Sequence, residues 1–160
     1  MTRSPATRTV ATRSRSTHRL STRIVVVDAG PLFALVNRSD SWHARVREWW
    51  ITTTATEILV CSTVIPEVCY LLHQRVSPLA EIDFVGLIAS GELTVEPVRD
   101  ADSARALQLM KRYATLPVGY VDATVVAVAE RLRADAILTT DRRHFTVMRD
   151  AKGRALTLVP

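Results

Sequence analysis

Short runs of β-branched and aliphatic residues alternate along the chain with amphipathic stretches of helical length. The runs 24–27, 58–61, 93–95 and 136–139 show no polar alternation, as expected of strands covered on both faces of a parallel sheet. Residues 155–159 predict a last short strand. Pairs of segments with helical spacing separate the first four runs. The pattern predicts an α/β fold, a three-layer α/β/α sandwich with a mostly parallel central sheet.

Capping residues predict where several helices begin and end. Pro31 opens a helix directly after the first strand, because proline suits the first helical turn. Ser62 is predicted to cap a helix over 63–74. Ser77 is predicted to cap the next helix, which has apolar residues on most of its positions and ends at Gly91.

Two aspartates follow directly on buried strands. Asp28 ends the first run, and Asp141 lies just past the fourth. The carboxyl ends of parallel strands share one edge of the sheet, and ligands gather there. Asp is also common at helix N-caps, so Asp141 is alternatively a cap for the short turn 142–145.

Two further acids lie on helices, at positions where polar side chains are not expected. Asp122 precedes Val125 and Val126 by three and four residues, so it shares the face that its helix should bury, unless it is the N-cap. Glu67 is read as part of the apolar face of helix 63–74; the alternative is a place on the flank of that face, reaching water. Both lie early in their helices, which begin at the edge where the strands end.

Four carboxylates converging on one edge would repel one another strongly. A divalent cation removes this repulsion, and hard cations such as Mg²⁺ and Mn²⁺ prefer carboxylate and water oxygens. The chain has no cluster of His or Cys that would favour zinc. Such a site holds one or two metals that lower the pKa of a bound water and neutralise phosphate charge. This chemistry suits phosphodiester hydrolysis by in-line attack of water.

Competing catalytic motifs are missing from the sequence. It contains no Walker loop, GxGxxG motif or Ser-His-Asp arrangement. A haloacid-dehalogenase phosphatase also begins with an Asp after an apolar strand. That class needs a second Asp two residues later, where this chain has Gly30.

The composition limits the classes of protein to which the chain can belong. A chain of 160 residues with 48% apolar and 23% charged residues supports one domain with a real core. No apolar run is long enough to span a bilayer, and no secretory signal follows the first residues. Cys61 and Cys69 fit neither a zinc pattern nor a disulfide framework, so we expect reduced thiols in a cytoplasmic protein without membrane association.

The excess of positive charge belongs to the N-terminal segment. Residues 1–23 hold six of the 21 basic residues and no acid, which leaves 15 basic against 16 acidic groups in the rest of the chain. This Arg-, Ser- and Thr-rich segment is predicted to be disordered. It is a basic arm for nucleic acid, a transit peptide, or the product of a start site assigned too far upstream; the last is favoured. The domain is expected to span 24–160.

Four ordered motifs carry a resemblance to a known family. The segments VVVDAGPLFAL, STVIPEVCYLL, GYVDATVVAVAERL and ILTTDRRHF, spread over residues 24 to about 159, resemble the motifs of PIN-domain ribonucleases, and specifically of VapC toxins of bacterial toxin-antitoxin pairs. The resemblance implies that Thr140 is a supporting hydroxyl. It also implies that the metal-binding and catalytic acids are Asp28, Glu67, Asp122 and Asp141.

The resemblance further implies activity and partners. We expect an Mg²⁺- or Mn²⁺-dependent endoribonuclease that inhibits translation by cutting tRNA, rRNA or mRNA, is inhibited by a VapB-like antitoxin, and forms a homodimer. An RNA-processing PIN nuclease without an antitoxin is one alternative. A non-catalytic PIN binding module is another, but such a module has no need to retain all four acids. Arg142, Arg143 and His144 either contact the RNA backbone or form a solvated basic turn.

Overall fold

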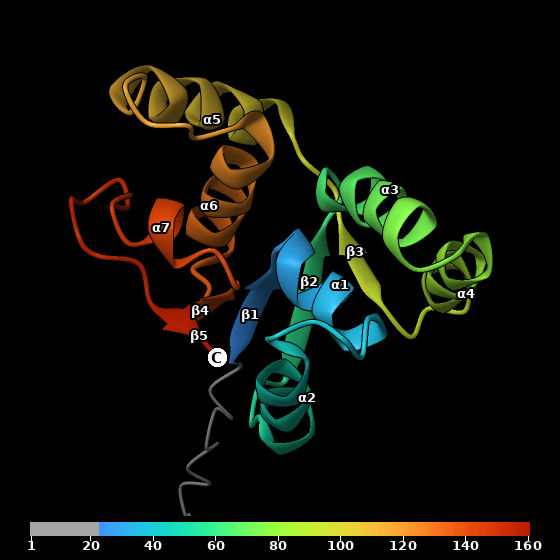
Figure 1. The fold of residues 1–160 in the computed structure, drawn as a ribbon. Helices are drawn as coiled ribbons and strands as arrows, with labels where there is room; N and C mark the ends of the chain where they lie inside the picture. The colour runs from blue at the N-terminus through green and yellow to red at the C-terminus, as the bar shows by residue number, and fades with distance from the viewer. Residues whose placement is uncertain (1–22) are drawn as a thin grey trace, which may run out of the picture.

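A computed structural model describes residues 23–160 of the chain. Figure 1 shows the elements and their arrangement. In chain order they are β1 (Ile24–Val27), α1 (Ala29–Val36), α2 (His43–Thr52), β2 (Glu57–Cys61), α3 (Val64–Arg75), α4 (Pro78–Ala89), β3 (Thr94–Glu96), α5 (Asp100–Arg112), α6 (Tyr120–Leu132), β4 (Ala136–Leu138), α7 (Arg142–Phe145) and β5 (Leu158–Val159).

The sheet is parallel throughout, which confirms the predicted α/β architecture. Its strand order is β3-β2-β1-β4-β5. Val27 pairs with Val60 of β2 and with Leu138 of β4, so the three central strands end at one level. The chain runs from β1 to β2 and β3 on one side and then returns to β4 on the other. The carboxyl ends of β1 and β4 therefore form the point where strand order reverses, where open α/β sheets bind ligands.

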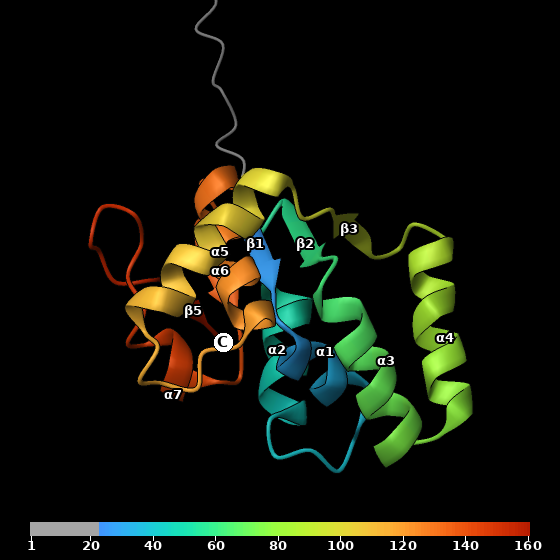
Figure 2. The ribbon, with the colours of Figure 1, turned by 90° about the horizontal axis from the view of Figure 1, so that it is seen from above.

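Helices cover both faces of the sheet. α6 packs on β1, β2 and β4, and its residues 123–129 are all buried. α5 packs against α6, whereas α1 to α4 lie on the other side of the central strands (Figure 2). Val26 and Val27 have no exposed surface, because β1 is covered on both faces. This burial accounts for the uninterrupted apolar run of the strand.

Arginine ion pairs hold α5 and β3 to α6. The Arg105 guanidinium lies 2.8 Å from Glu130, near the end of α6. Arg131 lies 2.9 Å from the buried carboxylate of Asp102 and 2.8 Å from Glu96. Because Asp102 is only 2% exposed, its pairing with Arg131 satisfies a charge that would otherwise be costly to bury. The carboxyl half of α6 is thereby fixed to two neighbouring elements.

Two predicted boundaries are wrong. Ser62 does not cap α3, since its hydroxyl accepts a hydrogen bond from the amide of Val98 and Thr63 precedes the helix instead. The last strand covers only two residues of the predicted 155–159. By contrast, Ser77 caps α4 as predicted, by accepting a hydrogen bond from the amide of Ala80 at 3.1 Å.

Helix α4 is apolar on its outer side. Phe84 is its buried residue, packed into the core. Leu79, Ile82 and Val85 are exposed by 70%, 62% and 45% of their surface. These three residues are called the α4 stripe below. The apolar pattern that predicted this helix thus reflects an uncovered face as well as the core.

Arg23 belongs to the folded domain. Its amide donates to Thr56 Oγ1, and its carbonyl accepts hydrogen bonds from the amides of Thr56 and Glu57. The rest of the predicted N-terminal extension lies outside the described residues. Cys61 and Cys69 are free thiols, as predicted. Within residues 23–160, no helix has the length and apolarity needed to cross a membrane.

Candidate active site

Asp28 is the most deeply placed acid at the switch point. It follows β1 and precedes α1, its amide donates to Leu138 O at 3.0 Å, and the residue is only 6% exposed. Burial raises the pKa of Asp28 to about 7, and the negative charges of Asp122 and Glu67 act in the same direction. A carboxyl group in this position is poorly stabilised as an anion unless a cation lies close to it.

Thr139 joins Asp28 to Asp141. Its hydroxyl, fully buried at the end of β4, donates to Asp28 Oδ2 at 2.8 Å and accepts from the amide of Asp141 at 3.0 Å. The expectation that Thr140 supports the site is corrected here, because the hydroxyl that contacts the acid is that of Thr139. The sequence contained a signal for Thr139, because it is a polar residue at the end of the otherwise apolar run 136–139.

Asp141 and Asp122 converge on His144. Asp141 caps α7 by accepting hydrogen bonds from the amides of Arg143 and His144, so the capping interpretation of Asp141 is confirmed. Its Oδ2 lies 2.9 Å from His144 Nδ1. Asp122 Oδ2 lies 3.4 Å from the same nitrogen. His144 Nδ1 is buried and finds no hydrogen-bond partner of acceptable geometry within residues 23–160, so both contacts are close approaches rather than aligned hydrogen bonds.

Asp122 lies in the first turn of α6 but is not its N-cap. The cap is Gly119, whose amide donates to Asp122 Oδ2 at 3.3 Å. Burial raises the pKa of Asp122, whereas the Gly119 amide and His144 lower it and the charge of Asp141 raises it. The bias toward the neutral form indicates that Asp122 lies in a partly dry, acidic environment.

Glu67 lies at the margin of the site. It is exposed, while Val64 and Val68 beside it on α3 are fully buried. The prediction that Glu67 shares the buried face is therefore wrong, and it occupies the flank of that face. Partial burial raises the pKa of Glu67, and the charge of Asp122 raises it further. That electrostatic effect places Glu67 within range of the other acids.

The three basic residues that follow Asp141 lie in three different environments. Arg142 turns toward β5, where its guanidinium donates to the carbonyls of Leu158 and Pro160. His144 turns inward to the acids, which the sequence interpretation missed. Arg143 alone of the three is exposed. Only Arg143 remains available for contact with an RNA backbone.

The donor set fits a hard divalent cation. Its members are carboxylates, and burial together with the charge of neighbouring acids raises the pKa of Asp28, Glu67 and Asp122. Within the described residues, the buried Nδ1 of His144 has no hydrogen-bond partner and lies between Asp122 and Asp141. In the described part of the chain, no three His, Cys, Asp or Glu side chains stand close enough together to form a ready metal cluster.

Gly30 allows the two strand ends to approach closely. A Cβ atom built at Gly30 would lie 2.1 Å from Thr140 Oγ1, well inside van der Waals contact. Gly30 follows Asp28 by two residues, and Thr140 precedes Asp141. The contact therefore sets the spacing between the loops that carry two of the acids.

Substitution Gly30→Ala should lower the RNA cleavage that the sequence predicts by about 10- to 100-fold, because small displacements of reacting groups have effects of that size. Overpacking should also cost about 1–3 kcal/mol of the free energy of unfolding. The measurements are initial cleavage rates and urea unfolding. The double variant Gly30→Ala/Thr140→Ala removes the clashing hydroxyl and should recover most of the activity. An unimpaired single variant would show that the loops tolerate a wider spacing.

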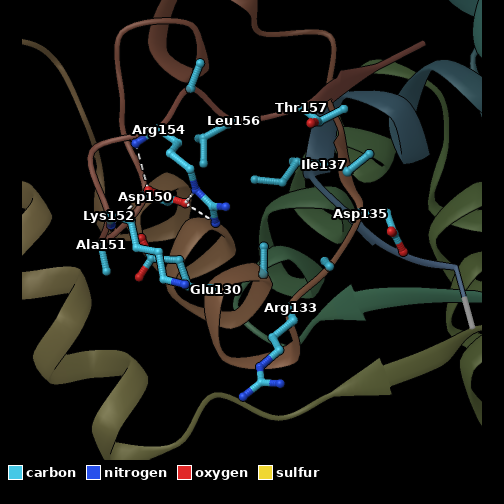
Figure 3. A pocket seen from close by; sticks show the side chains of 14 residues that line it. Glu130, Arg133, Asp135, Ile137, Asp150, Ala151, Lys152, Arg154, Leu156 and Thr157 are labelled. Atoms are coloured by element: carbon cyan, nitrogen blue, oxygen red, sulfur yellow. Dashed lines mark hydrogen bonds and ion pairs between the residues drawn. The ribbon is translucent and has the colours of Figure 1, made fainter.

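A hollow of about 770 Å³ lies away from these acids. Figure 3 shows it between the end of α6 and the segment 150–157, with Arg133, Asp135 and Lys152 around it. Asp150 is engaged there by the backbone amide and guanidinium of Arg154, both at 2.8 Å. None of the four predicted acids lines this hollow, so it is not the candidate active site.

Comparison with known proteins yields matches in sequence and in structure. Residues 25–150 match the PIN domain. The chain is 31% identical over 136 residues to Ribonuclease VapC26 of Mycobacterium tuberculosis, covering 85% of this chain and 100% of that one. Its fold is similar to that of M. tuberculosis VapC20, described as a sarcin-ricin-loop-cleaving toxin, with a TM-score of 0.66 and 23% identity over 71% of this chain and 86% of that one. A DNA-bound VapBC structure from Salmonella typhimurium gives a TM-score of 0.60 at 15% identity, covering 86% and 97% of the two chains.

Proposed function

The chain belongs to the PIN-domain family and, within it, to the VapC-type ribonucleases, and from this premise we propose that it is a toxin that cleaves RNA phosphodiester bonds with the help of Mg²⁺ or Mn²⁺. The observation that carries the proposal is the convergence of acids at the switch point of the sheet. Asp28, Asp122 and Asp141 lie around Thr139 and His144, with Glu67 at the margin. These four carboxylates would hold the cation.

The bound cation would neutralise charge on the scissile phosphate and make a water molecule more acidic. The chain's own residues prepare for this. Thr139 fixes the orientation of the Asp28 carboxylate, and the first turn of α7 fixes that of Asp141. His144 lies between Asp122 and Asp141 and closely approaches both carboxylates. Arg143 is placed to approach the RNA backbone beside the acids.

The proposed substrate is tRNA, rRNA or mRNA, with inhibition of translation as the consequence. The VapC20 structure, described as that of a toxin cleaving the sarcin-ricin loop, supports rRNA as one candidate. Several structural matches are VapBC complexes, which supports a VapB-like antitoxin as partner. The exposed α4 stripe supports a homodimer, since exposed apolar patches mark interaction surfaces. We place the protein in the cytoplasm.

Metal removal tests this function. Purified protein is incubated with total RNA in EDTA, and then with Mg²⁺ or Mn²⁺ restored. We expect no cleavage in EDTA and discrete fragments after the metal is returned, because the proposed site relies on a bound cation to acidify the attacking water and to neutralise charge on the phosphate. The fragments would identify the class of RNA that is cut.

Two controls separate this activity from contamination. Cleavage that persists in EDTA would indicate a metal-independent nuclease. The variant Asp122→Asn, purified in the same way, carries any contaminant but has lost one of the acids at nearly constant volume. Full metal-dependent cleavage by Asp122→Asn would contradict the assignment of the site. No cleavage of any RNA by the wild-type protein with metal present would favour a binding module instead.

A further inference from the structure

A chain of three polar side chains crosses the interior between α3 and α6. Cys61 Sγ, at the end of β2, lies 3.2 Å from Thr63 Oγ1. Thr63 Oγ1 lies 2.7 Å from Thr124 Oγ1 in α6. Cys61 and Thr124 have no exposed surface. None of these residues belongs to the acids described above, and nothing proposed so far assigns them a role.

The proton positions in this chain follow from its last acceptor. Thr124 Oγ1 also lies 2.8 Å from the carbonyl of Val121, which can only accept, so the Thr124 hydroxyl donates there. Its oxygen must then accept from Thr63, whose oxygen in turn accepts from the Cys61 thiol. Each hydroxyl thus donates once and accepts once. A buried polar chain satisfied in this way is directional and rigid.

The chain joins the two helices that carry Glu67 and Asp122. Thr63 directly precedes α3 and lies four residues before Glu67, on the same side of the helix. Thr124 lies two residues after Asp122, within the early part of α6. The two helices cover opposite sides of the central strands (Figure 2), so the hydroxyl contact bridges across the carboxyl edge of the sheet.

Glu67 and Asp122 need such a link more than the other two acids do. Asp28 and Asp141 are fixed to each other through Thr139. Glu67, by contrast, is exposed and forms no hydrogen bond or ion pair with a side chain of the described residues; only the charge of Asp122 acts on it. The position of its helix relative to α6 therefore decides whether Glu67 and Asp122 face a common point.

We propose that the Cys61–Thr63–Thr124 chain is a positioning element that holds Glu67 and Asp122 at a spacing suited to one divalent cation. The inference rests on the proposed metal-dependent function and assigns it three further residues. They touch neither the metal nor the RNA, and they act only through the helices that bear the acids. Removing the link should weaken metal binding while leaving RNA binding unchanged.

The test is Mn²⁺ binding by the full-length Thr124→Val protein, followed by electron paramagnetic resonance of free Mn²⁺. Valine keeps the volume but offers no acceptor to Thr63. We expect Mn²⁺ affinity about 10- to 100-fold below wild type, the range found when partners that orient metal ligands are lost. At limiting Mn²⁺ the cleavage rate should fall in parallel, whereas KM for RNA at saturating Mn²⁺ should not change. Thr124→Ser, which keeps the hydroxyl, should restore affinity.

Thr52→Val is the matched control. The Thr52 hydroxyl also donates to a carbonyl of its own helix, that of Glu48 at 2.8 Å, but it lies on α2 and is exposed. Its loss should leave Mn²⁺ affinity unchanged. If Thr124→Val fails to fold, Thr63→Val removes the same link from the half-buried side and should show the same loss.

The outcomes are distinct. Wild-type Mn²⁺ affinity in a folded Thr124→Val or Thr63→Val protein would overturn the positioning role and leave the proposed function intact. A wild-type protein that neither binds Mn²⁺ nor cleaves RNA would overturn both. Equal losses in Thr124→Val and Thr124→Ser would show that any change in the shape of residue 124 lowers the affinity, whether or not the hydroxyl is kept, and would also overturn the inference.

Discussion

Substitution Asp28→Asn should abolish RNA cleavage and, in the absence of metal, make the protein more stable than wild type at pH 8. The loss of activity should exceed about 100-fold, because Asp28 is one of the proposed metal ligands, and removing a ligand has a larger effect than removing a group that only orients one. The gain in stability follows from burial. Asp28 is a carboxyl group whose ionised form the fold disfavours, and asparagine never ionises.

The sign of the pH dependence follows from the raised pKa of Asp28. Its ordinary value is 3.8, and burial raises it to about 7 in the folded protein. Between these values the unfolded chain has released a proton that the folded protein still holds, so the free energy of unfolding falls as pH rises. Above pH 7 the penalty is constant, at most about 4 kcal/mol. It disappears only well below the ordinary pKa of 3.8, where the carboxyl group is protonated in both states.

Thermal unfolding in EDTA measures this effect. The difference in Tm between Asp28→Asn and wild type should be clearly smaller at pH 5 than at pH 8, because only part of the penalty has developed at pH 5. Asp83→Asn is the matched control, since Asp83 is an exposed carboxylate of α4 and its substitution should shift neither Tm nor activity. A Tm difference that is the same at both pH values would show that ionisation of Asp28 is not the cause. Retained cleavage would remove Asp28 from the site.

The sequence predicted the fold because the apolar runs are governed by burial on both faces of the strands. Val25 to Val27 carry no polar residue, and a helix follows at once with Pro31 in its first turn. The shorter elements had no such signal. α7 has only four residues, too few for a helical period, and β5 only two. The strands at the edge of a sheet depend on partners that a local pattern does not reveal.

The positions of Asp28 and Asp141 were predictable, because a residue directly after a parallel strand must lie at the carboxyl edge. The face of α3 on which Glu67 lies was not predictable. Val64 and Val68 bracket it, and a rotation of one residue separates the buried face from its flank. The inward turn of His144 depends on Asp141 capping α7, which orients the first helical turn. These features arise from tertiary packing rather than from local spacing.

The choice between Thr139 and Thr140 shows the same limit. Successive side chains of a strand point to opposite faces, so only one of two neighbouring threonines can reach Asp28. Which one does so depends on the register of β4 against β1, where Val27 pairs with Leu138. The local sequence pattern does not reveal that register. The contact between Thr139 and Asp28 at 2.8 Å follows from it.

Substitution Thr139→Val should therefore have a large effect on both stability and pH dependence. It leaves the Asp141 amide without its acceptor and removes a donor from Asp28, at nearly constant volume. Loss of the two hydrogen bonds in a fully buried position should cost about 2–5 kcal/mol of the free energy of unfolding. The Thr139 hydroxyl lowers the pKa of Asp28, so its loss should raise that pKa further.

Loss of the Thr139 hydroxyl should also change the pH dependence of RNA cleavage. Asp28 must be ionised to hold a cation, so the acid limb of the pH–rate profile should move to higher pH in Thr139→Val and return in Thr139→Ser. Cleavage rates from pH 5 to 9 at limiting Mn²⁺, where metal and proton compete for Asp28, measure the limb, and urea unfolding measures the stability. Thr140→Val is the matched control, because its hydroxyl faces Gly30 and not the acid. A shift of the limb in Thr140→Val, with none in Thr139→Val, would assign the supporting hydroxyl to the other residue.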